Sequence, residues 1–370
     1  MKKIKLGIEA LHVNMKHITG IERYNLLVLE ALDKYSEMNE NLFESVMIFT
    51  KEVFDVSEYN NLNIRFVETN LDNYEELVNR EEIDLLHCTF VPPTNNITAP
   101  VVYTLHDVGR YLYPEFMDQT LMNDHINKLQ ILLDNRKCTV LTVSKSSQQQ
   151  IEDVLNIPKQ INFYAALYPN KSFCHRVKTM SHVYEYIAKN NLHDYILVVG
   201  CFIPTKNVIS IIEAYHRAKD KSYIPSQTKL VIVGKEGWDR SVEKAAKDFD
   251  DVLRLTDVSD DELLELYKNC KLFVSASLIE GFGLPLIEAA YLDASIICSD
   301  IPPYREILPE SGHFFSATNI EQIADYMGQY YGKENDYSKD ISKFSSMEMG
   351  RQLVDCYSNT LNYFESIVVN

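Results

Sequence analysis

Short apolar runs alternate with helix-length amphipathic segments along most of this 370-residue chain, and this alternation constrains the fold more than any other feature. Near-continuous apolar runs are typical of strands that are buried on both faces, as in parallel sheets covered by helices. Strands that alternate with helices along the sequence indicate the same arrangement. The sequence therefore predicts an α/β fold built on parallel sheets.

The expected strands fall into two groups, which an irregular stretch separates. The first group is expected at Ile4–Glu9, Ser45–Phe49, Ile64–Val67, Leu85–Cys88, Val101–Leu105, Val140–Val143 and Ile161–Tyr164. The stretch "AALYPNKSFCHRVKTMSH" has no clear period and contains Pro169 and Asn170, which predicts a linker. The second group is expected at residues 194–200, Lys229–Val233, Val252–Arg254, Leu272–Val274, Ser295–Cys298 and His313–Phe315.

Two such groups predict two Rossmann-like domains that face a cleft, formed by residues 1–168 and 169–345. Residues 346–370 have a helical pattern, and we expect this segment to return towards the N-terminal domain. Open parallel sheets bind ligands beyond the carboxyl ends of their strands. Functional residues are therefore expected in the loops that follow the strands.

The composition limits the partners and the location of the protein. Lys and Arg number 36 against 53 Asp and Glu, a formal net charge of −17. Such a surface argues against nucleic-acid binding, and an anionic ligand needs a local positive pocket. No apolar run approaches the roughly 18 residues of a spanning helix, and the start "MKKIKLGIEAL" reads as a strand and not as a signal peptide. We expect a cytoplasmic protein, with a peripheral contact at the inner face of the membrane left open. The seven cysteines include no C-x-x-C, so no metal site is expected.

The stretch "SLIEGFGLPLIEAA", residues 277–290, carries the most specific local pattern. It lies between the expected strand "KLFVSAS" and the expected helix "LPLIEAAYL", whose Pro285 suits a first helical turn. Gly281, Phe282 and Gly283 then form the turn between them. Backbone N–H groups and the positive end of the helix dipole converge on such a turn and suit a phosphate, and glycines let a ligand approach the backbone closely.

Glu280 and Glu288 flank this turn. From the helix, Glu288 could accept hydrogen bonds from the adjacent hydroxyls of a ribose, and Glu280 could hold the hydroxyls of a sugar. A nucleotide-diphosphate sugar satisfies both carboxylates and the phosphate-binding turn. The alternative is a helix N-terminus whose acids only stabilise the helix dipole, by about 0.3–1 kcal/mol each.

Three further residues follow expected strands. Lys206, in "IPTKN", could reach a diphosphate, or it could be a solvated surface lysine. His106, after "VVYTL", could hydrogen-bond a sugar hydroxyl, or it could be a partly buried structural histidine. Gly20, in "ITGIERY", could bring backbone N–H groups towards the diphosphate, or it could be a simple strand-to-helix turn.

Segments along most of the chain resemble glycosyltransferase family four, in the expected order. "EGFGLPLIEAA" resembles the E-x7-E signature, and the likeness extends to "DASIICSDIPPYREIL", "VSDDELLELYKNCKLFVSAS", "YILVVGCFIPTKNVISIIEAY" and "LVIVGKEGW". In the first half, "TGIERYNLLVLEAL", "VVYTLHDVGRYLYPEF" and "LTVSKSSQQQIEDVL" are similar to family segments. The resemblance implies a retaining enzyme of GT-B architecture. Such an enzyme moves a sugar from a nucleotide-diphosphate sugar to an acceptor hydroxyl, without a cofactor or a metal.

The resemblance also implies roles for individual residues. His106, Lys206 and Glu280 are expected to be catalytic, and Asp107 and Arg110 are expected on the acceptor side. The donor is expected to contact Gly20, Asn207, Lys235, Thr256, Val258, Gly281, Phe282, Gly283, Leu284 and Glu288. The implied acceptor is a carbohydrate or a lipid-linked glycan, and the implied process is glycan or surface polysaccharide assembly.

One departure from the family pattern keeps alternatives open. Thr205 stands where the family usually has an arginine, and Lys235 or Arg110 could compensate. A non-catalytic partner subunit that binds a nucleotide sugar is therefore an alternative. A nucleotide-sugar epimerase of the same architecture is another, against which the acceptor-type segment "HDVGRYLYPEF" argues. The sequence does not identify the donor base, the sugar, the acceptor or the oligomeric state.

Overall fold

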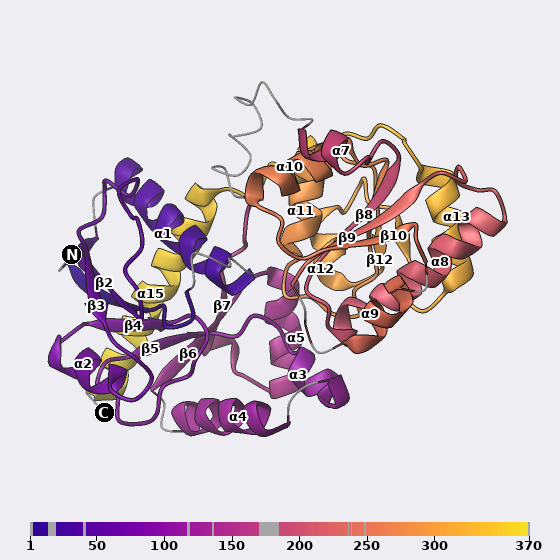
Figure 1. Cartoon of the computed structure of the whole chain (residues 1–370). Helices are drawn as coiled ribbons and strands as arrows, with labels where there is room; N and C mark the ends of the chain where they lie inside the picture. Colours follow the sequence, from indigo (N-terminus) through magenta and orange to yellow (C-terminus); the bar gives the residue numbers. More distant parts are fainter. Residues whose placement is uncertain are drawn as a thin grey trace. The chain divides into compact units, whose positions relative to one another are not determined.

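The computed structural model describes residues 3–13, 20–39, 42–116, 119–134, 137–169, 185–235, 237, 239–247 and 249–368. The chain divides into two compact units, which are drawn in Figure 1. The first unit comprises Met1–Tyr168 and Phe344–Asn370, and the second comprises Pro169–Lys343. Each unit has its own parallel sheet, as the alternating pattern predicts.

The first unit contains a seven-stranded sheet in the order β3-β2-β1-β4-β5-β6-β7, and all neighbouring pairs are parallel. Its central strands are apolar because helices cover both faces of the sheet, and every residue of β4, β5 and β6 is buried. The predicted strands are confirmed, with ends that differ by at most two residues. The strands are β1 (Ile4–Glu9), β2 (Phe43–Thr50), β3 (Ile64–Glu68), β4 (Leu85–Cys88), β5 (Val101–Thr104), β6 (Cys138–Thr142) and β7 (Asn162–Tyr164).

Helices connect these strands. The Ser144 side chain accepts a hydrogen bond from the backbone N–H of Ser147, so Ser144 is the N-cap of α5. The helices of the first unit are α1 (Gly20–Met38), α2 (Tyr74–Arg80), α3 (Gly109–Leu112), α4 (Gln119–Asp134), α5 (Lys145–Leu155) and α15 (Ser346–Val368), with 3-10 turns at Pro114–Phe116 and Lys159–Ile161.

The C-terminal helix α15 belongs to the first unit, where it packs against α1 (Figure 1). Gly350 permits the close approach, because a Cβ atom there would lie 2.3 Å from the carbonyl oxygen of Ala31 in α1. Further along α15, the hydroxyl of Thr360 lies 2.7 Å from that of Thr139 in β6. Hydrogen bonding to the sheet therefore adds to the packing of the last helix.

A buried polar network around His87 also connects α15 to the sheet. Nδ1 of His87 in β4 lies 2.8 Å from the hydroxyl of Tyr357 in α15, and Nε2 lies 2.8 Å from Oγ1 of Thr104 in β5. The Tyr24 hydroxyl of α1 lies 2.9 Å from the same Oγ1. Burial lowers the pKa of His87 to about 3, so the ring is neutral at neutral pH and both nitrogens are hydrogen-bonded to hydroxyls.

The second unit contains a six-stranded sheet in the order β10-β9-β8-β11-β12-β13, again with parallel pairs throughout. Its strands are β8 (Tyr195–Val199), β9 (Lys229–Val233), β10 (Val252–Leu255), β11 (Leu272–Ser275), β12 (Ile296–Ser299) and β13 (Phe314–Phe315). Its helices are α7 (Glu185–Lys189), α8 (Val208–Asp220), α9 (Arg240–Lys247), α10 (Asp260–Asn269), α11 (Leu284–Tyr291), α12 (Pro302–Ile307), α13 (Ile320–Tyr330) and α14 (Ser338–Ile341), with a 3-10 turn at Pro204–Lys206.

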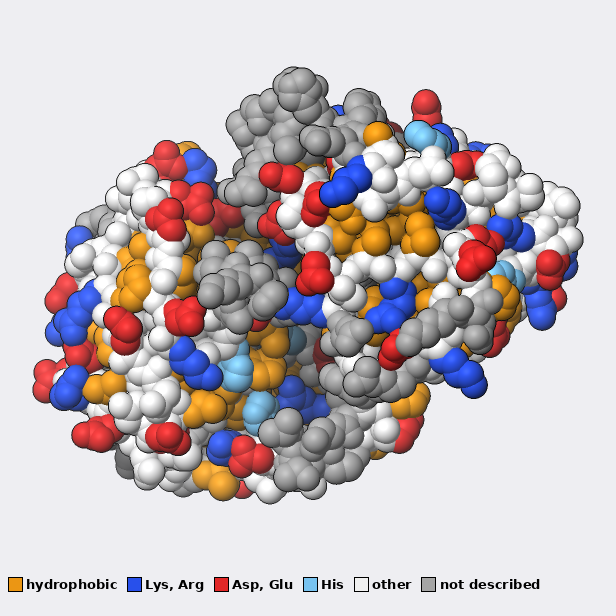
Figure 2. Space-filling model, viewed as in Figure 1, with side chains coloured by type: hydrophobic (Ala, Val, Ile, Leu, Met, Phe, Trp, Pro, Cys, Tyr) orange, Lys and Arg blue, Asp and Glu red, His pale blue; other side chains and the backbone are white. Residues whose placement is uncertain are grey.

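The core of the second unit lies between its sheet and covering helices. Tyr215 of α8 and Met327 of α13 are fully buried and pack with strand residues such as Ile232. Ser259 is the N-cap of α10, where the Ser259 and Glu262 side chains each accept a hydrogen bond from the other residue's backbone N–H. On the face drawn in Figure 2, acidic and basic side chains are interspersed on both units. Within the described residues, no helix is both long enough and apolar enough to cross a membrane.

Candidate active site

Residues 276–283 connect β11 to α11, as the sequence predicts. Gly283 has a φ of 114°, in a region that residues with a Cβ atom rarely adopt. A Cβ atom on Gly283 would also lie 2.6 Å from Cε1 of Tyr304. Glycine is therefore required at this position by its backbone conformation and by the Tyr304 ring.

The rest of the turn is packed into the second unit. Gly281 is buried, Phe282 is 2% exposed, and Leu284 at the start of α11 is half-buried. The sequence predicts that the glycines leave room for a ligand, whereas at Gly283 the structure shows that the space is used by Tyr304. Contact of these residues with a donor phosphate stays a prediction.

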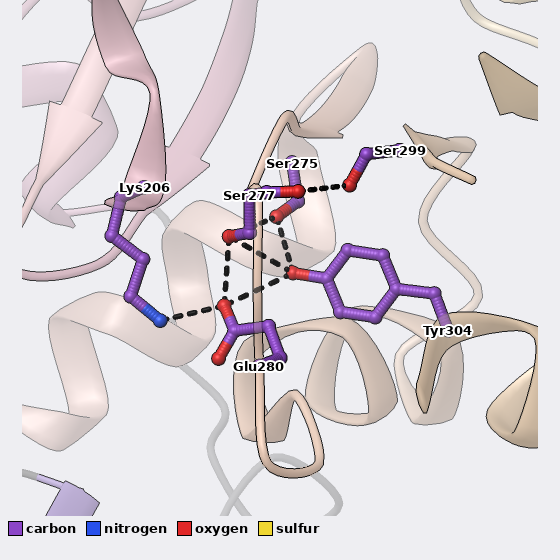
Figure 3. Close-up of polar contacts among 6 residues, drawn as sticks. All are labelled: Lys206, Ser275, Ser277, Glu280, Ser299 and Tyr304. Atoms are coloured by element: carbon purple, nitrogen blue, oxygen red, sulfur yellow. Dashed lines mark hydrogen bonds and ion pairs between the residues drawn. The ribbon is translucent and has the colours of Figure 1, made fainter. Parts of the chain in front are cut away.

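Glu280 and Lys206 are brought together by the turn that precedes α11 and the turn that follows β8. Nζ of Lys206 lies 2.6 Å from Oε1 of Glu280 (Figure 3). The same Oε1 accepts hydrogen bonds from the hydroxyls of Ser277 at 2.7 Å and Tyr304 at 3.2 Å. The side chains of Lys206 and Glu280 are 23% and 12% exposed, so the pair is held by the protein but reachable from solvent.

Tyr304 supports this pair, and the sequence pattern does not indicate it. Its hydroxyl lies 2.6 Å from Oγ of Ser275 and donates to Oγ of Ser277 at 3.3 Å. The backbone of Ser277 is itself held, because Ser299 donates to its carbonyl oxygen at 2.6 Å. Burial raises the pKa of Tyr304 well above its usual value, so the hydroxyl keeps its proton. The signal for Tyr304 is its place just after β12, the neighbour of β11 in the sheet.

Asn207 has a structural role in addition to the predicted donor contact. Its φ of 53° places it in the left-handed region between the 3-10 turn and α8. Its Nδ2 donates to the carbonyl oxygens of Ala276 at 3.2 Å and Ala317 at 2.8 Å, and its Oδ1 accepts from Ser210 at 2.7 Å. Asn207 therefore ties the Lys206 turn to the residues that follow β11 and β13.

Thr205, at the position of the family's customary arginine, faces the protein. It is 5% exposed, and its carbonyl oxygen accepts from the N–H of Leu278 at 2.8 Å. The residue therefore contributes to the packing of the Lys206 turn against the Glu280 turn. It offers no positive charge to a ligand.

Glu288 lies inside the second unit and is 3% exposed. Its Oε2 accepts a hydrogen bond from the hydroxyl of Tyr267 in α10 at 3.1 Å. The sequence predicts a ribose as the partner of this carboxylate and does not indicate Tyr267. The ribose contact stays a prediction.

The remaining predicted donor residues of the second unit follow β9 and β10. Lys235 is half-buried, and its carbonyl oxygen accepts from Phe202 at 3.1 Å, so it lies beside the loop that leads to Lys206. Thr256 is exposed and Val258 is half-buried. Since β10, β9, β8 and β11 are neighbours in a parallel sheet, these residues lie at the same edge as the Lys206–Glu280 pair.

The first unit carries the other predicted residues. Nε2 of His106 donates to the carbonyl oxygen of Thr89 at 2.8 Å, and its ring lies edge-on to Tyr24, with centroids 4.9 Å apart. Burial lowers the pKa of His106 below its usual value, which favours the neutral ring. Histidine side chains, in pale blue, are visible beside hydrophobic side chains on the first unit in Figure 2.

Asp107 lies in the loop after His106, Arg110 lies in α3, and Gly20 begins α1. Oδ1 of Asp107 accepts from the N–H of Gly109 at 2.7 Å and thereby orders the start of α3. Nη1 of Arg110 lies 3.3 Å from Nδ1 of His125 in α4. Gly20 is exposed, and apart from its chain neighbours and the backbone of its own helix no described atom lies within 4 Å of where its Cβ would be. No group of three or more His, Cys, Asp or Glu side chains in the described part of the chain is arranged to hold a metal ion.

Two Rossmann-like units, with polar residues and a glycine-containing turn at the carboxyl ends of parallel strands, define the GT-B architecture. Residues 185–345 match the family model described as glycosyl transferases group 1. The protein is a glycosyltransferase.

Two curated proteins are similar in sequence to this chain. The O-antigen chain mannosyltransferase B of Escherichia coli is 24% identical over 277 residues, which cover 71% of this chain and 70% of that protein. The O-antigen chain mannosyltransferase RfbU of Salmonella typhimurium is 27% identical over 255 residues, which cover 64% of this chain and 66% of that protein. The solved structure of Anabaena HepE in complex with UDP and glucose aligns with a TM-score of 0.64 and 15% identity, covering 96% of this chain and 99% of that one.

Proposed function

We propose that this glycosyltransferase is a retaining enzyme of family four. It transfers a hexose from a nucleotide-diphosphate sugar to a hydroxyl of a carbohydrate or lipid-linked glycan, in the assembly of a surface polysaccharide. The observation that carries the proposal is the Lys206–Glu280 pair beside the turn into α11. This arrangement joins a cation suited to a diphosphate to a carboxylate suited to sugar hydroxyls.

Lys206 can serve the diphosphate without leaving Glu280. A lysine ammonium has three N–H donors, so one can bond Glu280 while another reaches a phosphate oxygen. The helix α11 directs its N-terminal backbone towards the same turn, which favours negative charge there. Lys206, aided by Lys235, then stabilises the charge that develops on the departing diphosphate.

The reaction step follows from these roles. The bond between the anomeric carbon and the diphosphate oxygen breaks, and a bond to the acceptor oxygen forms on the same face of the sugar. The proton of the acceptor hydroxyl goes to the departing phosphate oxygen. Glu280 orients the sugar through its hydroxyls, and His106 accepts a hydrogen bond from another hydroxyl. Glu288 anchors the ribose.

The proposed hexose is mannose. The two curated relatives carry mannosyltransferase names, and both names refer to the O-antigen chain. A pocket selects one hexose from another by hydrogen bonds to its hydroxyls, and an unpaired hydroxyl-binding group costs affinity. The donor is therefore proposed to be a nucleotide-diphosphate mannose.

The purified protein tests the proposal directly. We expect the melting temperature to rise with one nucleotide-diphosphate mannose in a panel of GDP and UDP sugars, since a ligand bound only to the native state stabilises it. Incubation with that donor and a glycan acceptor should give a product whose anomeric configuration, read by NMR, matches the donor. A product of opposite configuration would contradict retention, and epimerised donor formed without an acceptor would identify an epimerase.

A non-catalytic partner subunit is the second candidate, favoured by the buried Thr205 where the family usually has an arginine. Such a subunit would bind the donor in the thermal-shift assay but would neither transfer nor hydrolyse it. Glu280→Gln separates the two candidates, because it removes the charge and keeps the shape of the side chain. In the enzyme we expect this change to abolish most of the transfer, whereas a binding subunit has no transfer to lose.

A further inference from the structure

Glu9, the last residue of β1, is a buried carboxylate to which neither the family resemblance nor the proposed reaction gives a role. It is 0% exposed. In the sheet it lies opposite Cys88 at the end of β4, and Cys88 lies opposite Tyr103 in β5. Glu9 therefore sits at the edge where the loops that follow β4 and β5 begin, and the second of these loops carries His106.

The carboxylate of Glu9 organises the loop after β4. Its Oε2 accepts hydrogen bonds from three consecutive backbone N–H groups, those of Thr89 at 3.2 Å, Phe90 at 3.1 Å and Val91 at 3.4 Å. Its Oε1 accepts from the N–H of Leu11 at 3.0 Å. Successive N–H groups that converge on one point form an anion-binding nest, and here the anion is a side chain of the protein itself.

Thr89 connects this nest to His106. The hydroxyl of Thr89 donates to the carbonyl oxygen of Glu9 at 2.7 Å. The side chain and the backbone N–H of Thr89 are therefore both hydrogen-bonded to Glu9. The carbonyl oxygen of Thr89 accepts from Nε2 of His106 at 2.8 Å. A carbonyl oxygen can only accept, so the proton of the neutral ring lies on Nε2 and Nδ1 is left as a hydrogen-bond acceptor.

We propose that Glu9 is a positioning residue for His106: it holds the carbonyl oxygen of Thr89 in place, and that oxygen fixes the His106 ring with Nδ1 as the acceptor. The assignment of Nδ1 to a hydroxyl of the transferred sugar rests on the proposed function. The hydrogen-bonded chain from Glu9 to His106 does not, because it consists of contacts within the first unit.

The state of the His106 ring tests the chain without any assay of activity. In the full-length protein labelled with ¹⁵N-histidine, a two-bond ¹H–¹⁵N spectrum distinguishes the protonated ring nitrogen from the bare one, and His106→Gln identifies the signals. We expect Nε2 to carry the proton at neutral pH. A proton on Nδ1 in the unaltered protein would overturn the proposal.

Glu9→Gln tests the carboxylate while keeping its shape. An amide has one acceptor oxygen, so either the nest or Leu11 then faces an N–H₂ group. We expect the His106 signals to shift and a second tautomer to become populated. The matched control is Asp84→Asn, because Oδ2 of Asp84 accepts from the N–H of Lys5 at 2.8 Å at the other end of β4. The control should leave the His106 signals unchanged.

The activity measurement separates positioning from general destabilisation. With a donor that the enzyme uses, Glu9→Gln should lower kcat about tenfold, a barrier increase of roughly 1.4 kcal/mol, and Asp84→Asn should not. If no donor is turned over, the proposed function fails while the NMR result still decides the role of Glu9.

Where Glu9→Gln does not fold, Thr89→Val replaces the hydroxyl that bonds Glu9 with a methyl group and should shift the His106 signals in the same direction. Unchanged His106 signals in the folded variant would overturn the proposal.

Discussion

The ammonium of Lys206 lies 2.6 Å from Oε1 of Glu280, although the two residues follow different strands, β8 and β11, of the second unit. The contact neutralises a carboxylate that would otherwise repel a diphosphate at the same edge of the sheet. It also fixes a lysine side chain that would be mobile in isolation. In an acidic protein of net charge −17, the pair places the N–H donors of an ammonium at this edge of the sheet and leaves neither charge without a partner.

Lys206→Met should weaken donor binding. The substitution removes a charge-assisted hydrogen bond to the diphosphate, for which we expect a loss of about 1.5–3 kcal/mol, or roughly tenfold to a hundredfold in the Kd of the donor. Isothermal titration calorimetry with the donor found in the thermal-shift panel measures this change.

The control for Lys206→Met is Lys219→Met. Nζ of Lys219 lies 2.5 Å from Oδ2 of Asp251, and its side chain is 19% exposed, close to the 23% of Lys206. This pair belongs to the same unit but involves α8 and no predicted donor residue. Equal losses of donor affinity in the two variants would mean that Lys206 acts only through the stability of the fold.

Tyr304→Phe should lower the rate of transfer with little change in stability. It keeps the ring that packs on Gly283 and removes the hydroxyl that bonds Glu280 and Ser277. A neutral hydrogen bond contributes about 1 kcal/mol to the free energy of unfolding, whereas a misplaced Glu280 should lower kcat by about tenfold or more. Steady-state kinetics and urea unfolding provide both quantities.

Tyr337→Phe is the matched control. Tyr337 is 0% exposed, and its hydroxyl accepts from the N–H of Ile296 at 3.0 Å in the same unit. Its loss should reduce stability by a similar amount and leave kcat unchanged. A fall in kcat that is the same in both variants would show that Glu280 does not depend on Tyr304.

Gly283→Ala should reduce both stability and donor binding. The new Cβ atom would meet the Tyr304 ring at 2.6 Å, and the φ of 114° is strained for alanine. Strain of this kind costs about 1–3 kcal/mol, and the turn into α11 must shift to relieve it. Thermal unfolding and donor titration measure the two effects.

Gly332→Ala isolates the backbone part of that cost. Gly332 has a φ of 65°, but apart from its own residue and its two chain neighbours no described atom lies within 4 Å of its Cβ position. We expect a loss of about 1 kcal/mol from strain alone and unchanged donor affinity. If Gly283→Ala costs no more than Gly332→Ala, the contact with Tyr304 does not matter.

The stability of the first unit should depend on pH through His87. The ordinary pKa of histidine is about 6.5, and burial lowers that of His87 to about 3 in the folded protein. Between these values the unfolded chain binds a proton that the folded chain does not. The free energy of unfolding should therefore fall as the pH falls from about 6.5 towards 3, by about 1.4 kcal/mol per pH unit for this group.

His87→Gln should be less stable than the parent protein at pH 7 but less sensitive to acid. Between pH 6.5 and 5 we expect the stability of the parent to fall by about 2 kcal/mol more than that of the variant. His193→Gln, at an exposed position in the second unit, should keep the slope of the parent. Parallel pH profiles for the parent and His87→Gln would contradict the assignment.

The periodicity of the sequence was sufficient for the strands, because buried parallel strands must be apolar on both faces. It was not sufficient for the partners of the polar residues. Lys206 and Glu280 are 74 residues apart, and they meet because β8 and β11 are neighbours in the sheet. The periodicity does not determine which strands are neighbours. From the sequence alone, Lys206 and Glu280 are therefore predicted as separate contacts to a ligand and not as a pair.

Glu9 and Tyr304 are residues that the sequence did not indicate at all. Glu9 lies within the apolar stretch "KLGIEAL" and Tyr304 within the family-like segment "DASIICSDIPPYREIL", and neither stretch indicates a role for that residue. Their importance comes from the backbone groups and hydroxyls that the fold places around them. Residues that hold a site in place are therefore harder to predict than residues that match a family motif.

The position of α15 has a consequence for the synthesis of the chain. Residues 169–343 leave the ribosome as one continuous segment, but the first unit lacks α15 until residues 346–368 have also been synthesised. Domains fold largely as units during synthesis, so the second can form while α1 still lacks the helix that covers it. Nascent or prematurely terminated chains would then present the apolar side of α1 to chaperones and proteases, and quality control can discard an unfinished enzyme before it consumes donor.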